Sequence, residues 1–227
     1  MFDFDTLPDR RASDSVKWHY FEPDVIPMWV ADMDFRSPEA VMQALQQRVA
    51  HGIFGYPMDL PELKEVIIQR MAERYGWQIA TSDIVFVPGV VTGFNLVCRA
   101  LASEGSAALI QTPVYPPFLQ APANAGMERR EMQLTLLPDG TYGIDFDTFE
   151  DAITDRTNLF ILCNPHNPVG RVFTRGELEC MAEICLRHHL TICADEIHSD
   201  LVFPDHPHIP IATLDAEVAG RTITLIA

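Results

Sequence analysis

The chain has 227 residues, 48% of them hydrophobic, which is enough for one large domain with a sizeable buried core. Its 16 Lys and Arg against 32 Asp and Glu give a formal net charge of −16, so neither nucleic acid nor an anionic membrane is an expected partner. No apolar run approaches the roughly 20 residues of a membrane span, and the acidic opening MFDFDTLPDR is unlike a signal peptide. The five scattered cysteines favour reduced, buried thiols in a cytoplasmic protein, and no metal site is expected.

Residues 1–36 are rich in proline, aspartate and aromatic residues without a period, and they are expected to form an extended N-terminal arm. A first helix is predicted to start after Ser37 as its N-cap and to end at Gly52. A second helix is predicted from Pro61 to Gly76. Helical spacing places these apolar residues on the inward faces: Val41, Leu45, Val49, Leu63, Val66, Ile67 and Met71.

Beyond the second helix, apolar runs alternate with segments of helical spacing. Strands are predicted in DIVFVPG, AALIQTPVY, TNLFILCN, LTICADE and RTITLIA, with the polar ERREMQL as an edge strand. Helices are predicted around Phe94, around Phe149, and after Thr174, which forms a capping box with Glu177. Strands separated by helices imply a mostly parallel sheet covered on both faces, so the predicted fold class is α/β, a three-layer sandwich.

In such sheets, ligands bind beyond the carboxyl ends of the strands, so the residues that follow each strand are site candidates. Asp195 directly follows a buried strand, where a carboxylate is costly unless a cation or hydrogen-bond donor satisfies it. It could cap a nearby helix or turn, or it could pair with a protonated ligand nitrogen. His198, three residues later, could orient Asp195 or the ligand, or it could be structural.

Three further strand ends carry polar or flat groups. Asn167 lies in a turn stiffened by two prolines and by Gly170, a pattern that also suits an ordinary turn. Gly89 precedes a helix whose first N–H groups could hold a phosphate. Tyr115 has a flat ring that could stack on a ligand. The same sequence pattern is also expected for a half-buried aromatic residue with a structural role. Together with Asp195, these residues suit a planar, phosphorylated, pyridine-like cofactor.

The segments NPHNPVGRV and ADEIHSDLVF resemble the fold-type I pyridoxal-phosphate enzymes of aminotransferase class I/II. With LPDRR, SVKWHYF, IPMWVADMDF and HGIFGYP, nearly the whole chain resembles one branch, the cystathionine β-lyase-like C–S lyases of MalY/PatB type. This resemblance implies that residues 37–227 form the pyridoxal-phosphate-binding large domain, incomplete at its C-terminus. Residues 1–36 would be an arm or part of a small domain.

The resemblance implies roles around the cofactor ring by position. Asp195 would pair with the protonated pyridine nitrogen and keep the ring an electron sink. Asn167 would hydrogen-bond the 3-oxygen of the ring and help to hold the substrate carboxylate. Tyr115 would stack on the ring face. His198 stands where many aminotransferases have a tyrosine near the 3-oxygen.

Other roles concern the phosphate and the substrate. By the same resemblance, the N–H groups of Val90 and Val91 would hold the phosphate of pyridoxal 5'-phosphate. Tyr56 would reach the phosphate of the neighbouring subunit in a homodimer, and Ala31 would contact the substrate through its backbone.

One departure from the family pattern concerns the Schiff-base lysine. Family members carry it in a Ser-Lys context shortly after a strand like RTITLIA, so it is expected just beyond Ala227. Lys17 and Lys64 stand where the family has no catalytic role. No catalytic residue is therefore expected within this chain, and residues 1–227 alone are expected to be inactive.

The resemblance implies an intact enzyme that cleaves a carbon–sulfur bond β to an amino acid and releases a thiol, pyruvate and ammonia. Cystathionine is the leading substrate expected, and other cysteine S-conjugates fit equally. Two alternatives stay open at this point. One is an aminotransferase of class I/II, and the other is a non-catalytic fragment or regulatory module.

Overall fold

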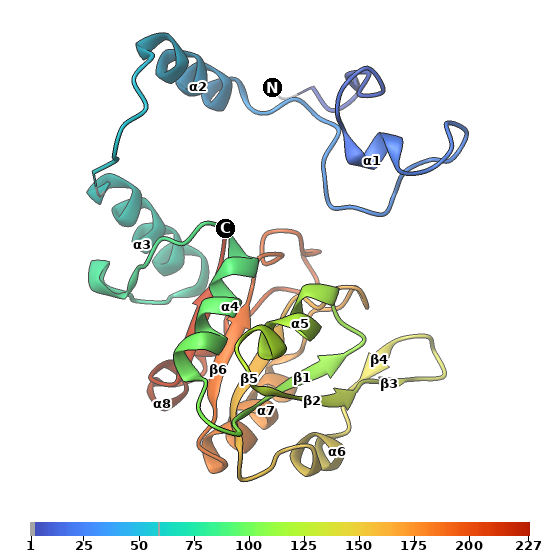
Figure 1. Ribbon diagram of the computed structural model, residues 1–227, viewed down its shortest axis with the longest axis vertical. Coiled ribbons are helices and arrows are strands. Elements are labelled where there is room, and N and C mark those ends of the chain that lie inside the picture. The colour runs from blue at the N-terminus through green and yellow to red at the C-terminus, as the bar shows by residue number, and fades with distance from the viewer. Residues whose placement is uncertain (1–2, 59) are drawn as a thin grey trace. The chain divides into compact units, whose positions relative to one another are not determined.

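The computed structural model describes residues 3–58 and 60–227, and the chain divides into two compact units, Met1–Asp59 and Leu60–Ala227 (Figure 1). The domain boundary predicted between residues 36 and 37 stays a prediction.

The first unit contains helices α1 (Val16–His19) and α2 (Glu39–His51). Ion pairs between side chains connect parts of its arm. The Arg10 guanidinium lies 2.7 Å from the Asp32 carboxylate and 2.8 Å from the Asp34 carboxylate. The Nζ of Lys17 donates to Asp34 at 2.7 Å, and this bond is the main cause that lowers the pKa of Asp34 to about 2. The expectation of an extended arm is therefore wrong at α1 and at this ion cluster.

Helix α2 ends as predicted at Gly52, whose φ of 73° is the left-handed conformation that glycine adopts freely. Its start is one residue later than predicted, because Pro38 and not Ser37 occupies the N-cap position. The face predicted to point inward is exposed, since α2 has no buried residue. An apolar stripe predicts burial only where another element covers it.

The second unit is built on a five-stranded parallel sheet (Figure 1). In spatial order its strands are β2 (Glu128–Gln133), β1 (Ala107–Thr112), β5 (Thr157–Cys163), β6 (Thr191–Asp195) and β7 (Thr222–Leu225). Every pairing is parallel, as expected where helical crossovers join the strands, and the polar β2 is an edge strand as predicted.

Helices cover both faces of this sheet (Figure 1). Helices α4 (Val90–Leu101) and α5 (Pro116–Asn124) pack on one face, and α6 (Phe146–Asp151) and α7 (Arg175–Arg187) pack on the other. Along β5, side chains alternate between the two faces, as a pleated strand requires: Leu159, Ile161 and Cys163 join the α4–α5 core, while Phe160 and Leu162 join the α6–α7 core. The predicted three-layer α/β sandwich is confirmed.

The remaining elements complete the second unit. They are α3 (Pro61–Tyr75), α8 (Ala216–Ala219), two 3-10 turns (Thr81–Asp83 and Ile211–Thr213), and a hairpin of β3 (Thr135–Leu136) with β4 (Tyr142–Gly143). Residues 137–141 of the predicted LPDGTYG turn connect the two strands, and its last two residues form β4.

The predicted strand DIVFVPG is wrong. Thr81–Asp83 forms a 3-10 turn, and residues 84–88 have no strand partner within the part of the chain that the structure describes. A strand is defined by hydrogen bonds to a neighbour, so an apolar run without a neighbour stays irregular. The inward face predicted for α3 is confirmed only in part. Met71 is buried and Ile67 is half-buried, while Leu63 and Val66 are exposed.

The five cysteines are unpaired thiols, and four of them are buried as predicted; Cys180 is exposed. Within residues 3–58 and 60–227, no group of three His, Cys, Asp or Glu side chains is arranged to hold a metal ion. In the same ranges, no helix combines the length and apolar character needed to cross a membrane.

Candidate active site at the carboxyl edge of the sheet

The strand order reverses between β1 and β5. From β1, the chain crosses through α5 to β2 on one side, whereas β5 and the later strands lie on the other side. Ligands of open α/β sheets bind in the crevice at such a reversal, beyond the carboxyl ends of the strands. Tyr115 follows β1 and Asn167 follows β5, and the Tyr115 N–H donates to the Asn167 carbonyl at 3.0 Å. The fold therefore brings two predicted site residues together at this reversal.

The loop that carries Asn167 is closed on itself by hydrogen bonds. The His166 N–H donates to the Arg171 carbonyl at 2.8 Å, and the Gly170 N–H donates back to the His166 carbonyl at 2.9 Å. Gly170 has a φ of 71°, which side chains rarely allow. The Asn167 N–H lies 3.5 Å from the Cys163 sulfur, which accepts from it. This closed loop fixes the backbone of Asn167 at the end of β5.

Asp195 is the last residue of β6 and pairs in register with Cys163 of β5. Only 5% of its surface is exposed, and its Oδ1 accepts one hydrogen bond from the Ile197 N–H at 3.1 Å. Burial raises the pKa of Asp195 to about 6; the Ile197 bond opposes this shift, and the nearby Glu196 carboxylate adds to it. No cationic side chain pairs with Asp195 in the described ranges, so a cationic ligand group would be stabilised there.

A second buried acid lies directly beside Asp195. The Glu196 carboxylate accepts from the Nε2 of His208 at 2.9 Å and from the Ile211 N–H at 3.2 Å, and it is 2% exposed. Burial raises the pKa of Glu196, and the hydrogen bond from His208 opposes that shift. Sequence reasoning missed this pair because its members are twelve residues apart. The sequence signal that could have indicated Glu196 was a second acidic residue after a buried strand, next to Asp195.

Helix α4 begins at the position where a phosphate cradle is predicted. Gly89 precedes the helix with a φ of 101°, and the first helical residues are Val90 and Val91. The first N–H groups of a helix have no acceptor within it and favour an anion. The Val90 side chain belongs to the same buried cluster as Cys163 and Cys193, which places the start of α4 against β5 and β6.

The remaining predicted residues are outside this group or at its margin. His198 lies in the turn after β6, partly exposed, where its carbonyl accepts from the Leu201 N–H at 2.9 Å. Tyr56 and Ala31 belong to the first unit and are exposed. The second unit thus gathers Val90, Val91, Tyr115, Asn167 and Asp195 at one edge of its sheet, and their individual roles stay predictions.

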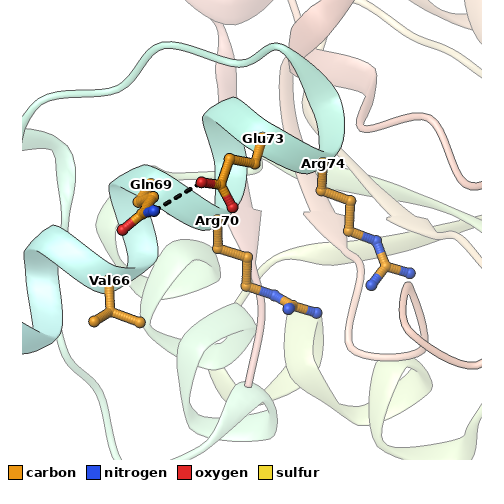
Figure 2. Close-up of a pocket in the computed structure, with 5 residues that line it drawn as sticks. All are labelled: Val66, Gln69, Arg70, Glu73 and Arg74. Carbon is orange, nitrogen blue, oxygen red and sulfur yellow. Dashed lines mark hydrogen bonds between the residues drawn. The ribbon is translucent and has the colours of Figure 1, made fainter.

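A surface hollow on α3 contains none of the predicted residues. Figure 2 shows its lining: Val66, Gln69, Arg70, Glu73 and Arg74. Arg70 and Arg74 form ion pairs with Asp200 at 2.6 and 2.9 Å. These arginines attach α3 to the turn that follows β6, and their role is explained by that contact.

Comparison with known proteins agrees with this geometry. The family model for aminotransferase class I and II matches residues 23–226. The chain belongs to the aminotransferase class I and II family. It is 41% identical to the cystathionine β-lyase PatB of Bacillus subtilis strain 168 over 99% of this chain and 59% of PatB. It is 28% identical to the aspartate aminotransferase of Geobacillus stearothermophilus over 89% of this chain and 51% of that enzyme.

Among solved structures, cystalysin from Treponema denticola, which contains a pyridoxal 5'-phosphate cofactor, superposes with a TM-score of 0.92 at 33% identity. That match covers 100% of this chain and 59% of cystalysin. The chain therefore spans about three fifths of the length of PatB and of cystalysin.

Proposed function

We propose that the whole protein is a pyridoxal-phosphate-dependent carbon–sulfur β-lyase that releases a thiol, pyruvate and ammonia from cystathionine or another cysteine S-conjugate. The observation that carries this proposal is the buried Asp195 carboxylate, whose pKa is raised to about 6 and which lacks a cationic partner in the described residues. The similarity to PatB over 99% of the chain supports the choice of a lyase reaction.

The residues at the carboxyl edge fit pyridoxal phosphate. A protonated pyridine nitrogen would give Asp195 the cation it lacks and would lower the pKa of that carboxyl. The free N–H groups of Val90 and Val91 suit a phosphate dianion. When bound, pyridoxal phosphate supplies an electron-withdrawing ring that eases loss of the substrate Cα proton.

The chain's own residues would hold and orient this ring. Tyr115 would pack against the ring face, and the Asn167 amide would donate to the 3-oxygen and to the substrate carboxylate. His198 would lie near the same oxygen, and Ala31 would contact the substrate through its backbone. The closed loop around Asn167 supports this arrangement, because its backbone is already held in place and loses little freedom when a ligand binds.

We place the lysine that takes the Cα proton beyond Ala227. Lys17 is engaged with the Asp34 carboxylate and the Asp32 carbonyl inside the arm, which supports a structural role for it. We further propose that the protein is a homodimer in the cytoplasm, with Tyr56 reaching the phosphate of the partner. The full exposure of the Tyr56 side chain and the acidic, disulfide-free composition support these two points.

An aminotransferase remains the second candidate function, because an aspartate aminotransferase is similar over 89% of the chain. Both reactions would use the same ring-holding residues and would differ in the fate of the substrate amino group.

The test supplies the purified full-length protein with pyridoxal phosphate and cystathionine and follows pyruvate through lactate dehydrogenase and NADH absorbance. A lyase releases pyruvate and a thiol in equal amounts without any added oxo acid. Formation of a new amino acid that depends on an added oxo acid, without pyruvate release, would establish the aminotransferase instead.

A further inference from the structure

His166 is a buried residue beside Asn167, with 2% of its surface exposed. Its Nε2 lies 2.9 Å from the Pro113 carbonyl oxygen, and its Nδ1 lies 3.1 Å from the Cys163 carbonyl oxygen. Pro113 is two residues before Tyr115, so the imidazole ring spans two loops. These are the loops that carry the side chains proposed to contact the cofactor ring.

The position of this ring is tightly determined. The backbone of His166 is bonded on both sides, through Arg171 and Gly170, and its ring meets the edge of Phe173 with centroids 5.7 Å apart. A ring that is held at its backbone and packed on one side cannot swing away without breaking these contacts. His166 is therefore a rigid link between the two loops.

The proton on the ring decides which loop His166 binds. Burial lowers the pKa of His166, the Pro113 and Cys163 carbonyls oppose this shift, and Arg171 lowers the pKa further. The lowered pKa favours a neutral ring, and a neutral imidazole has one N–H, so only one carbonyl receives a hydrogen bond. The Pro113 contact is the shorter one, and it joins residues 53 positions apart.

We propose that His166 is a positioning residue, whose Nε2–H donates to the Pro113 carbonyl and so locks the Tyr115 loop to the Asn167 loop. The direct bond from the Tyr115 N–H to the Asn167 carbonyl closes the same link from the other side. These two hydrogen bonds fix the distance between the Tyr115 loop and the Asn167 loop before the cofactor binds. This inference rests on the proposed function, because it assumes that pyridoxal phosphate contacts both residues.

Two variants of His166 separate the two ring contacts. In His166→Gln, the amide nitrogen lies near the place of Nε2 and can still donate to Pro113. In His166→Asn, it lies near the place of Nδ1 and reaches only the Cys163 carbonyl. Both variants lose the ring contact with Phe173, so each serves as the other's control for packing.

The measurement is the Kd of the full-length protein for pyridoxal phosphate, followed by cofactor absorbance, with urea unfolding of both variants alongside. His166→Asn is expected to bind the cofactor about tenfold more weakly than His166→Gln, because one buried carbonyl loses its donor. The two unfolding midpoints are expected to lie close together. Equal affinities, or tighter binding by His166→Asn, would overturn the proposal.

A second readout needs no substitution. Nitrogen-15 NMR of the histidine-labelled full-length protein should show a hydrogen on Nε2 of His166 that exchanges slowly with water. An Nε2 without hydrogen would sink the proposal even if both variants fail to fold. The pyruvate assay reports separately on the reaction: an aminotransferase result together with an Nε2–H would remove the proposed lyase while supporting the role of His166.

Discussion

The ionised carboxylate of Asp195 lowers the stability of the fold, whereas the proposed function requires it. Burial raises its pKa from 3.8 to about 6, so the folded chain binds this proton more tightly than the unfolded chain does. Ionisation of Asp195 at neutral pH therefore costs the fold up to about 3 kcal/mol. A protonated ring nitrogen would offset that cost, because it places a cation beside the carboxylate.

The substitution Asp195→Asn separates these two effects. We expect pyruvate release by the full-length protein to fall by about 100-fold or more. The variant loses the ion pair between the carboxylate and the protonated ring nitrogen, and this interaction would become stronger as the reaction proceeds. We expect the cofactor-free protein to become more stable by up to about 3 kcal/mol at pH 7.5, since a neutral amide has no ionisation cost. Urea unfolding and the pyruvate assay measure the two quantities.

The gain in stability has a defined pH dependence. The cost of the Asp195 carboxylate is fully present above pH 6 and disappears as the pH falls toward 3.8, because the residue is then protonated in both states. Asp139→Asn is the matched control, since the pKa of exposed Asp139 is lowered by its hydrogen bonds with Thr141 and its loss should give no gain at neutral pH. A gain from Asp195→Asn that is equal at pH 7.5 and pH 4 would contradict this account.

Among the elements, α7 shows how one cap supports the loop of the candidate site. The Glu177 N–H donates to the Thr174 hydroxyl at 3.3 Å, and the Thr174 N–H donates to the Glu177 carboxylate at 2.8 Å. The same carboxylate pairs with Arg171, whose carbonyl accepts from the His166 N–H. The start of α7 is thereby connected to the closed loop that holds Asn167.

We expect Thr174→Ala to lower the free energy of unfolding by about 1 kcal/mol, because it removes the side-chain acceptor for an N–H in the first turn of α7. Thr174→Ser keeps the hydroxyl and is expected to retain most of that stability. Urea unfolding of the full-length protein compares the two variants. A Ser variant as unstable as the Ala variant would show that the threonine methyl group matters more than the cap.

For the whole molecule, the proposed dimer makes Tyr56 a testable residue. It lies in the first unit and its side chain is fully exposed, as expected for a residue that completes a partner's site. We expect Tyr56→Phe subunits mixed with Asp195→Asn subunits to regain activity, because each hybrid dimer would contain one site with both native residues. With equal amounts and random pairing, roughly a quarter of wild-type activity is expected.

Pyruvate release is measured before and after subunit exchange, and differently tagged subunits confirm that hybrids form. Each variant alone, taken through the same exchange, is the control. Hybrids no more active than their parents would show that Tyr56 does not serve the partner's site.

Much of the second unit could be predicted from local pattern. Continuous apolar runs predicted β1, β5 and β6, and the spacing of Thr174 and Glu177 predicted the start of α7. The ends of parallel strands meet at one edge of a sheet, so Tyr115, Asn167 and Asp195 could be expected near one another. The strands and the helix start depend on residues close together in the chain, whereas the meeting of the three site candidates follows from the general geometry of a parallel sheet.

The structure alone decided what depends on distant partners. Residues 84–88 are apolar but irregular because no described strand pairs with them. The apolar faces of α2 and α3 are largely exposed because no element among the described residues covers them. The Glu196–His208 pair and the contact of His166 with Pro113 join segments that no sequence spacing connects. Strand pairing, burial and side-chain orientation depend on contacts across the fold, so the tertiary structure determines them.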